Sequence, residues 1–103
     1  MNVFQLPEII ARQRPEEPWT DFLTKPSLIV GLYTVPEPDE ERHQPHADDE
    51  VYYVVSGRGV LHVEGEDAQV EAGTVAFVAA GQRHHFHSIS EELRLLVFFA
   101  RAK

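Results

Sequence analysis

The stretch QPHADDEVYYVVSGRG, residues 44–59, places a histidine and a row of acidic residues directly before a run of aromatic and β-branched residues. Such a run is typical of a β-strand. Successive strand side chains point to opposite faces, so Gln44, His46 and Glu50 share one face if the strand continues through them. Ionisable groups on a buried face are costly unless they are paired or bind a metal. The stretch therefore predicts a strand that carries metal ligands.

A second group of histidines lies in the stretch HHFHSI, residues 84–89. By the same alternation His84 points to one face, whereas His85 and His87 point to the other. If His84 faces inward with His46 and Glu50, two neutral imidazoles and one carboxylate converge in the interior. One divalent transition metal, namely Fe, Mn, Ni, Zn or Co, suits these donors. A fully hydrogen-bonded polar network without metal is the alternative.

Positions or roles can also be predicted for other histidines and for three aromatic residues. We expect His62, His85 and His87 at the surface or at an interface, because they alternate outward. Phe77 and Phe86 are expected to fill the interior. Tyr52 is a candidate proton donor, with simple packing as the alternative.

Most of the chain after Trp19 is predicted to form short strands with almost no helix. Strands are expected at 20–24, 27–35, 50–55, 60–65, 68–73, 74–79, 84–89 and 93–100. We expect turns at residues 57–59 and 90–92, and one or two helical turns at 6–12. Many short strands at regular spacing favour an all-β jelly-roll barrel with a short N-terminal helical or irregular segment.

Length, composition and charge exclude or disfavour several classes of function. A chain of 103 residues fits one domain, 1–103, with a core barrel at about 27–100 and an N-terminal arm at 1–26. It has no cysteine, which excludes disulfides and thiolate chemistry, and its formal charge of −8 disfavours nucleic acid and anionic membranes. No signal peptide or membrane span is evident, so we expect a cytoplasmic protein.

Two segments, 27–35 and 93–100, are apolar on both faces. A strand of a monomeric barrel should alternate between apolar and polar residues. The outer face is therefore expected to be covered, either by a symmetric partner in a homodimer or by the chain's own N-terminal segment.

The two motifs together resemble those of small single-domain cupins. The first cupin motif, G-x5-H-x-H-x3,4-E-x6-G, is matched at His46, Glu50 and Gly57. The second, G-x5-P-x-G-x2-H-x3-N, is matched at Gly73, Gly81 and His84. The resemblance implies a jelly-roll barrel of the RmlC-like type and a metal held by His46, Glu50 and His84.

The chain departs from the family pattern at several positions. The first histidine of the motif falls on Gln44, the proline on Ala79 and the asparagine on Ser88. Gln44 could bind metal through its amide oxygen, a weaker donor than imidazole. His43 could replace it if Pro45 causes a bulge, and we weight Gln44 over His43.

The resemblance leaves three functions open. The leading hypothesis is a metal-binding cupin that acts on or holds a small organic molecule; family precedent includes dioxygenases, isomerases and decarboxylases. The second is a ligand-binding or sensor module without chemistry, with or without metal. The third is a structural dimer with a vestigial polar cluster. The fold itself does not name a substrate.

Overall fold

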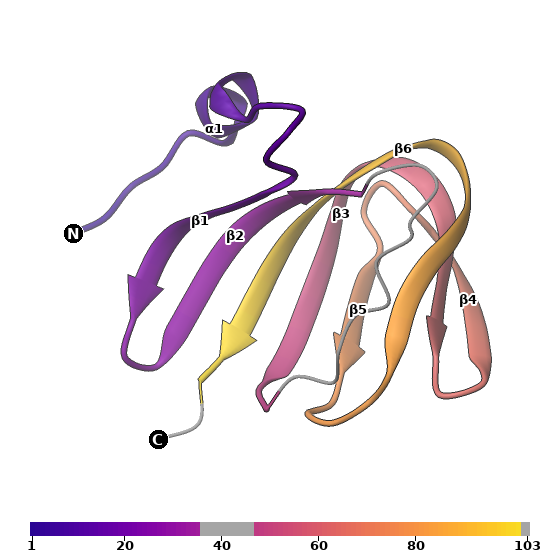
Figure 1. The fold of residues 1–103 in the computed structure, drawn as a ribbon. Coiled ribbons are helices and arrows are strands. Elements are labelled where there is room, and N and C mark those ends of the chain that lie inside the picture. Colours follow the sequence, from indigo (N-terminus) through magenta and orange to yellow (C-terminus); the bar gives the residue numbers. More distant parts are fainter. Residues whose placement is uncertain (36–46, 102–103) are drawn as a thin grey trace.

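The structure, a computed structural model, describes residues 1–35 and 47–101. Its elements are the helix α1 (Leu6–Arg12) and the strands β1 (Trp19–Lys25), β2 (Leu28–Thr34), β3 (Asp49–Val63), β4 (Glu66–Glu71), β5 (Val75–Val78) and β6 (His84–Ala100). The strands form an antiparallel sheet in the order β1-β2-β6-β3-β4, with β5 paired to β3 (Figure 1). The all-β prediction with one short N-terminal helix is confirmed. Within the described ranges, no helix is long and apolar enough to cross a bilayer.

Two strands are longer than predicted. β3 continues through residues 57–59 and β6 continues through residues 90–92, so the prediction of turns at these places is wrong. The chain reverses later, at Glu64 and Gly65, which both adopt positive φ angles between β3 and β4.

Gly57 lies at a bend within β3, not at a turn between two strands. Its φ is +97°, and the register between β3 and β6 shifts three times between Val54 and Val60. These irregularities increase the local bend of paired strands without ending them. A Cβ on Gly57 would lie 2.0 Å from the backbone oxygen of Glu92, so only glycine lets β3 and β6 approach this closely.

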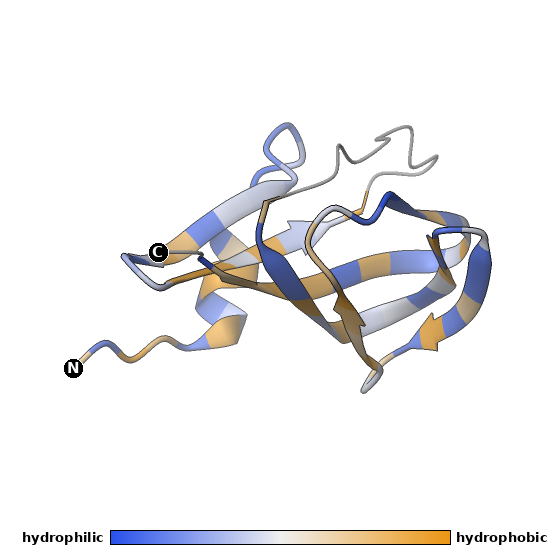
Figure 2. Ribbon diagram, turned by 90° about the horizontal axis from the view of Figure 1, so that it is seen from below, coloured by the Kyte–Doolittle hydropathy of each residue, from blue (hydrophilic) through white to orange (hydrophobic). Residues whose placement is uncertain are grey.

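The bend creates the interior. β3 and β6 curve together at the top of Figure 1, and their two halves then face each other. Hydrophobic and hydrophilic residues alternate in bands along these strands (Figure 2). The core cluster comprises Tyr33, Val35, Tyr52, Val54, Leu61, Val70, Val78, Phe86, Ile89, Leu93, Leu95 and Val97.

The N-terminal arm is fastened to the sheet by Gln13. Its side-chain amide donates to the carbonyl oxygens of Pro18 and Leu32, and its amide oxygen accepts from the Thr34 hydroxyl. Val30 and Leu32 point away from the core face yet are buried in the single chain. This part of the outer face of β2 is therefore covered without a partner, as one of the two alternatives expected. The homodimer itself stays a prediction.

Candidate functional site

Glu50 and His84 reach the interior from different strands. Glu50 is the second residue of β3, and His84 is the first residue of β6. Oε1 of Glu50 and Nε2 of His84 lie 3.5 Å apart, and their side chains are 2% and 1% exposed, respectively. Of the predicted metal ligands, the structure thus brings these two together.

The orientation of the His84 ring is set by the backbone just before it. Nδ1 of His84 lies 2.9 Å from the carbonyl oxygen of Gln82. A carbonyl oxygen only accepts, so Nδ1 carries the proton and donates it. In the neutral ring, Nε2 then presents its lone pair toward Glu50. A hydrogen bond from the ring nitrogen that does not bind the metal usually orients a metal-binding histidine in this way.

The geometry of the two donors suits a metal ion. Ligand atoms about 2.1 Å from a metal, at angles near 110°, lie roughly 3.5 Å from each other. The Glu50–His84 separation equals this value. One imidazole and one carboxylate also belong to the donor types that Zn, Fe, Mn, Ni and Co accept. The donor set therefore fits a divalent cation.

Aromatic rings surround this pair. The ring of Tyr52 lies 6.0 Å from that of His84 and 5.3 Å from that of Phe86. Tyr52 and Phe86 are both buried, and the short distance to the His84 ring places Tyr52 beside the candidate site. Its role as a proton donor stays a prediction. The prediction that Phe77 fills the interior is wrong, because Phe77 is exposed and pairs in register with Val51 on the outward face of β3.

Three predicted or alternative ligands fall outside the described residues. They are His43, Gln44 and His46, which lie between positions 35 and 47. Their part in the site is a prediction from the sequence.

A second group of potential metal donors lies on the outer face of the sheet. Nδ1 of His62 is 2.7 Å from Oδ1 of Asp67, and Nε2 of His87 is 3.1 Å from the same oxygen. One ligand atom from each of the three residues lies within 4.8 Å of the others. We call these residues the outer cluster. Sequence reasoning placed His62 and His87 at the surface correctly but did not connect them to Asp67.

These contacts favour the ionised form of Asp67. Hydrogen bonds from His87 and His62 hold the pKa of Asp67 below its usual value, so the group is a carboxylate near neutral pH. The register explains why sequence reasoning missed it. Asp67 faces His62 across the β3–β4 hairpin, whose turn was not predicted at Gly65.

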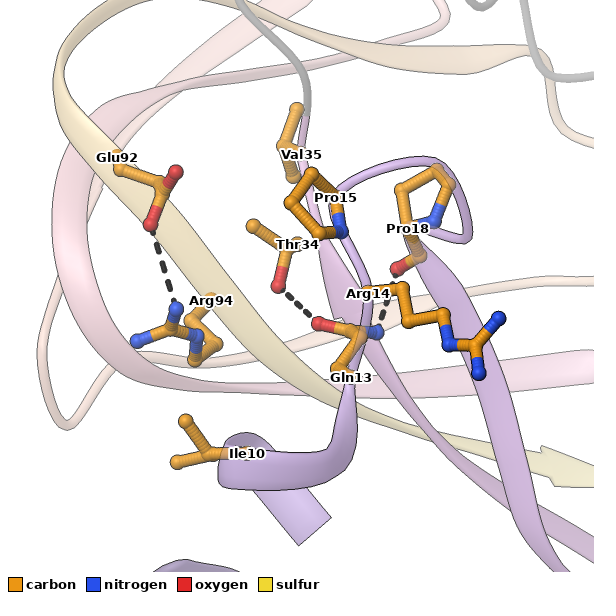
Figure 3. A pocket seen from close by; sticks show the side chains of 9 residues that line it. All are labelled: Ile10, Gln13, Arg14, Pro15, Pro18, Thr34, Val35, Glu92 and Arg94. Carbon is orange, nitrogen blue, oxygen red and sulfur yellow. Dashed lines mark hydrogen bonds and ion pairs between the residues drawn. The ribbon is translucent and has the colours of Figure 1, made fainter.

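A cavity of about 260 Å³ lies elsewhere, where the N-terminal arm meets β2 and β6 (Figure 3). Its lining residues are Ile10, Gln13, Arg14, Pro15, Pro18, Thr34, Val35, Glu92 and Arg94. Neither Glu50 nor His84 is among them. Arg94 is paired with Glu92 within β6, whereas the bond between Gln13 and Thr34 fastens the arm to β2.

The sequence model of the cupin domain matches residues 32–99, well over half of the chain. The chain belongs to the cupin family. This cupin is 43% identical over 101 residues to an uncharacterised protein of Streptomyces coelicolor, covering 97% of this chain and 96% of that protein.

Two shorter similarities involve proteins with named activities. An oxalate-binding protein of Thermotoga maritima is 38% identical over 60 residues, which are 58% of this chain and 50% of that protein. An acireductone dioxygenase of a Sulfurihydrogenibium species is 46% identical over 50 residues, 45% of this chain and 28% of that enzyme. The cupin thus spans half or less of either relative.

A solved structure supports the architecture along the whole chain. A crystal structure of a Thermus thermophilus protein superposes with a TM-score of 0.75 and 27% identity, covering 97% of each chain. Together with the family match, this establishes the predicted jelly-roll fold.

Proposed function

We propose that this cupin binds one divalent transition metal in its interior through His46, Glu50 and His84, and that this interior acts on or holds a small organic molecule. The observation that carries the proposal is the approach of the buried Glu50 carboxylate to Nε2 of His84 at 3.5 Å. His46 is added from the motif spacing. Gln44 is proposed as a fourth, weaker ligand.

The protein's own residues define what such a site does. A bound divalent metal supplies Lewis acidity toward a carbonyl or carboxylate oxygen. Glu50 offsets part of the cation's charge, and the Gln82 carbonyl holds the His84 ring in the ligating tautomer. The buried rings of Tyr52 and Phe86 limit access of water, which strengthens every electrostatic interaction in the site.

Oxygenase or isomerase chemistry on a small carbonyl, enol or carboxylate compound is the leading catalytic form of the proposal. The similarity to an acireductone dioxygenase supports it over 50 residues. Tyr52 is the proposed proton donor, because its ring lies beside His84. A cytoplasmic location and the homodimer accompany this proposal as untested predictions.

A non-catalytic binding module is the second candidate. The similarity to an oxalate-binding protein over 60 residues favours it. In this form the same metal would hold a small carboxylate without turning it over.

Metal analysis of untagged protein tests the site. We expect ICP-MS on protein produced with added Fe, Mn, Ni, Zn and Co to find tightly bound metal in the wild type. Glu50→Gln and His84→Gln, which keep size and polarity, should each lose one equivalent. Glu66→Gln is the matched control, since it removes an exposed carboxylate and leaves both the inner donors and the outer cluster intact. Equal metal content in the inner variants and the wild type would reject the inner site.

Incubation of metal-loaded protein with oxalate and a panel of small carbonyl and enol compounds separates the two functions. Loss of a compound, detected by chromatography, together with oxygen uptake or an isomeric product, supports an enzyme. A rise in Tm without loss of the compound supports the binding module. If neither occurs with any compound, the proposal that this site acts on such molecules fails.

A further inference from the structure

The outer cluster joins three neighbouring strands. His62 is on β3, Asp67 on β4 and His87 on β6. In the sheet register, His62 pairs with Asp67 on one side and with His85 on the other. His87 lies two residues beyond His85 on the same outward face. The three donors therefore come together because the strands pair in this register.

We propose that His62, Asp67 and His87 form a second, surface site for a divalent transition metal such as Zn²⁺ or Co²⁺. Two imidazole nitrogens and one carboxylate oxygen are donors that these cations accept, with water in the remaining positions. All three side chains are half-buried or exposed, so a cation reaches them directly from solvent. The site is independent of the interior one.

The hydrogen bonds within the outer cluster indicate where the cation would bind. Both histidine nitrogens point at the same oxygen, Oδ1 of Asp67, so the ring edges already converge. The Gly65 N–H donates to Nε2 of His62 at 3.3 Å, which places the His62 proton on Nδ1. For a metal to bind at Nδ1, the neutral ring must adopt the other tautomer with its proton on Nε2, and the Gly65 bond is then lost. That bond is long, so its loss costs little.

The surroundings of the cluster favour a cation. Asp67 is exposed, so it is ionised near neutral pH as an ordinary aspartate is, and it contributes a negative charge beside the two imidazoles. The His85 ring lies 5.0 Å from that of His62 and 5.6 Å from that of His87, so a third imidazole flanks the site. Nδ1 of His87 lies 2.9 Å from the Ser88 hydroxyl, which orients the ring from its other nitrogen.

A metal bound at the outer cluster would link three strands of the sheet. β4 stands at the end of the strand order, and β3 is its paired neighbour. Coordination from β4, β3 and β6 would tie this terminal strand to the strand on the far side of β3. Metal binding to the folded chain alone stabilises it by mass action. We therefore expect the outer site to raise Tm.

The experiment titrates untagged, chelator-treated protein with Zn²⁺ by calorimetry and with Co²⁺ by visible absorption. The double variant Glu50→Gln/His84→Gln serves as background, so that the interior donors are removed. In it we expect one equivalent of metal and a rise in Tm. Adding Asp67→Asn and His87→Gln should weaken binding at least tenfold and remove the Tm rise.

A control variant and a second test in the wild type accompany the metal titration. Glu66→Gln removes a neighbouring carboxylate of the same strand and should leave binding unchanged. If the background variant does not fold, Asp67→Asn/His87→Gln in the wild type should lower the stoichiometry by one equivalent. Unchanged stoichiometry, Co²⁺ spectrum and Tm in the cluster variants would overturn the outer site, whatever the fate of the interior one.

Discussion

Glu50 and His84 approach to 3.5 Å although the sheet register places them far apart. His84 pairs with Val63 at the end of β3, whereas Glu50 lies at the start of the same strand. A straight strand would separate Glu50 from Val63 by about 40 Å. The two side chains meet because β3 and β6 bend together and return on themselves (Figure 1). The candidate site therefore depends on this bend in β3 and β6.

Metal removal should destabilise the protein if the interior site is occupied. In an Asp67→Asn background, which lacks the outer carboxylate, a free metal concentration about 100 times Kd should stabilise the fold by about 2.7 kcal/mol. For a domain of this size that corresponds to roughly 10–20 °C in Tm. Differential scanning calorimetry with and without EDTA measures the shift. Adding His84→Gln should abolish it, and a shift that persists would argue against His84 as a ligand.

Gly57→Ala should lower the free energy of unfolding, because the bend in β3 depends on this glycine. The residue adopts a φ of +97°, and the new Cβ would meet the Glu92 backbone oxygen. Gly65 also has positive φ, but a Cβ there meets nothing within 4 Å. Gly65→Ala should therefore cost about 1 kcal/mol, from backbone strain alone. We expect Gly57→Ala to cost at least about 2 kcal/mol more in urea unfolding; equal costs would show that the close approach to Glu92 is unimportant.

Phe86 should carry much of the packing around the site. It is 1% exposed and stacks edge-on against Tyr52. Phe86→Ala should lower the free energy of unfolding by about 3–5 kcal/mol, because the cavity is only partly refilled. Phe4→Ala is the comparison, since Phe4 is exposed and has a ring contact with Phe22. It should cost about 1 kcal/mol, and a comparable loss for both variants would contradict the packing role.

The homodimer prediction can be tested on the exposed apolar side chains of β3 and β5. Tyr53 and Val75 pair in register, and Phe77 follows on the same face. All three are exposed in the single chain. Exposed apolar patches commonly mark interaction sites, so we expect a dimer in solution that Phe77→Glu dissociates. Light scattering coupled to size exclusion gives the mass; Ser90→Glu, which adds the same charge elsewhere, should leave it unchanged. A monomeric wild type would end this prediction.

Residue types and their order determined much of this protein. Alternation placed Glu50 and His84 inward and His85 and His87 outward, and the motif spacing alone indicated the family. These features follow from a period of two along each strand, which is a local property. The short helix at 6–12 followed likewise from its local sequence.

Only the tertiary structure decided how distant strands meet. The glycine pair at 57 and 59 signalled a turn locally, yet pairing with β6 made it a bend within one strand. The outward face of Phe77 and the approach of Asp67 to two histidines depend on cross-strand register. Register is fixed by the burial of whole faces and by the true turns, so no single segment specifies it.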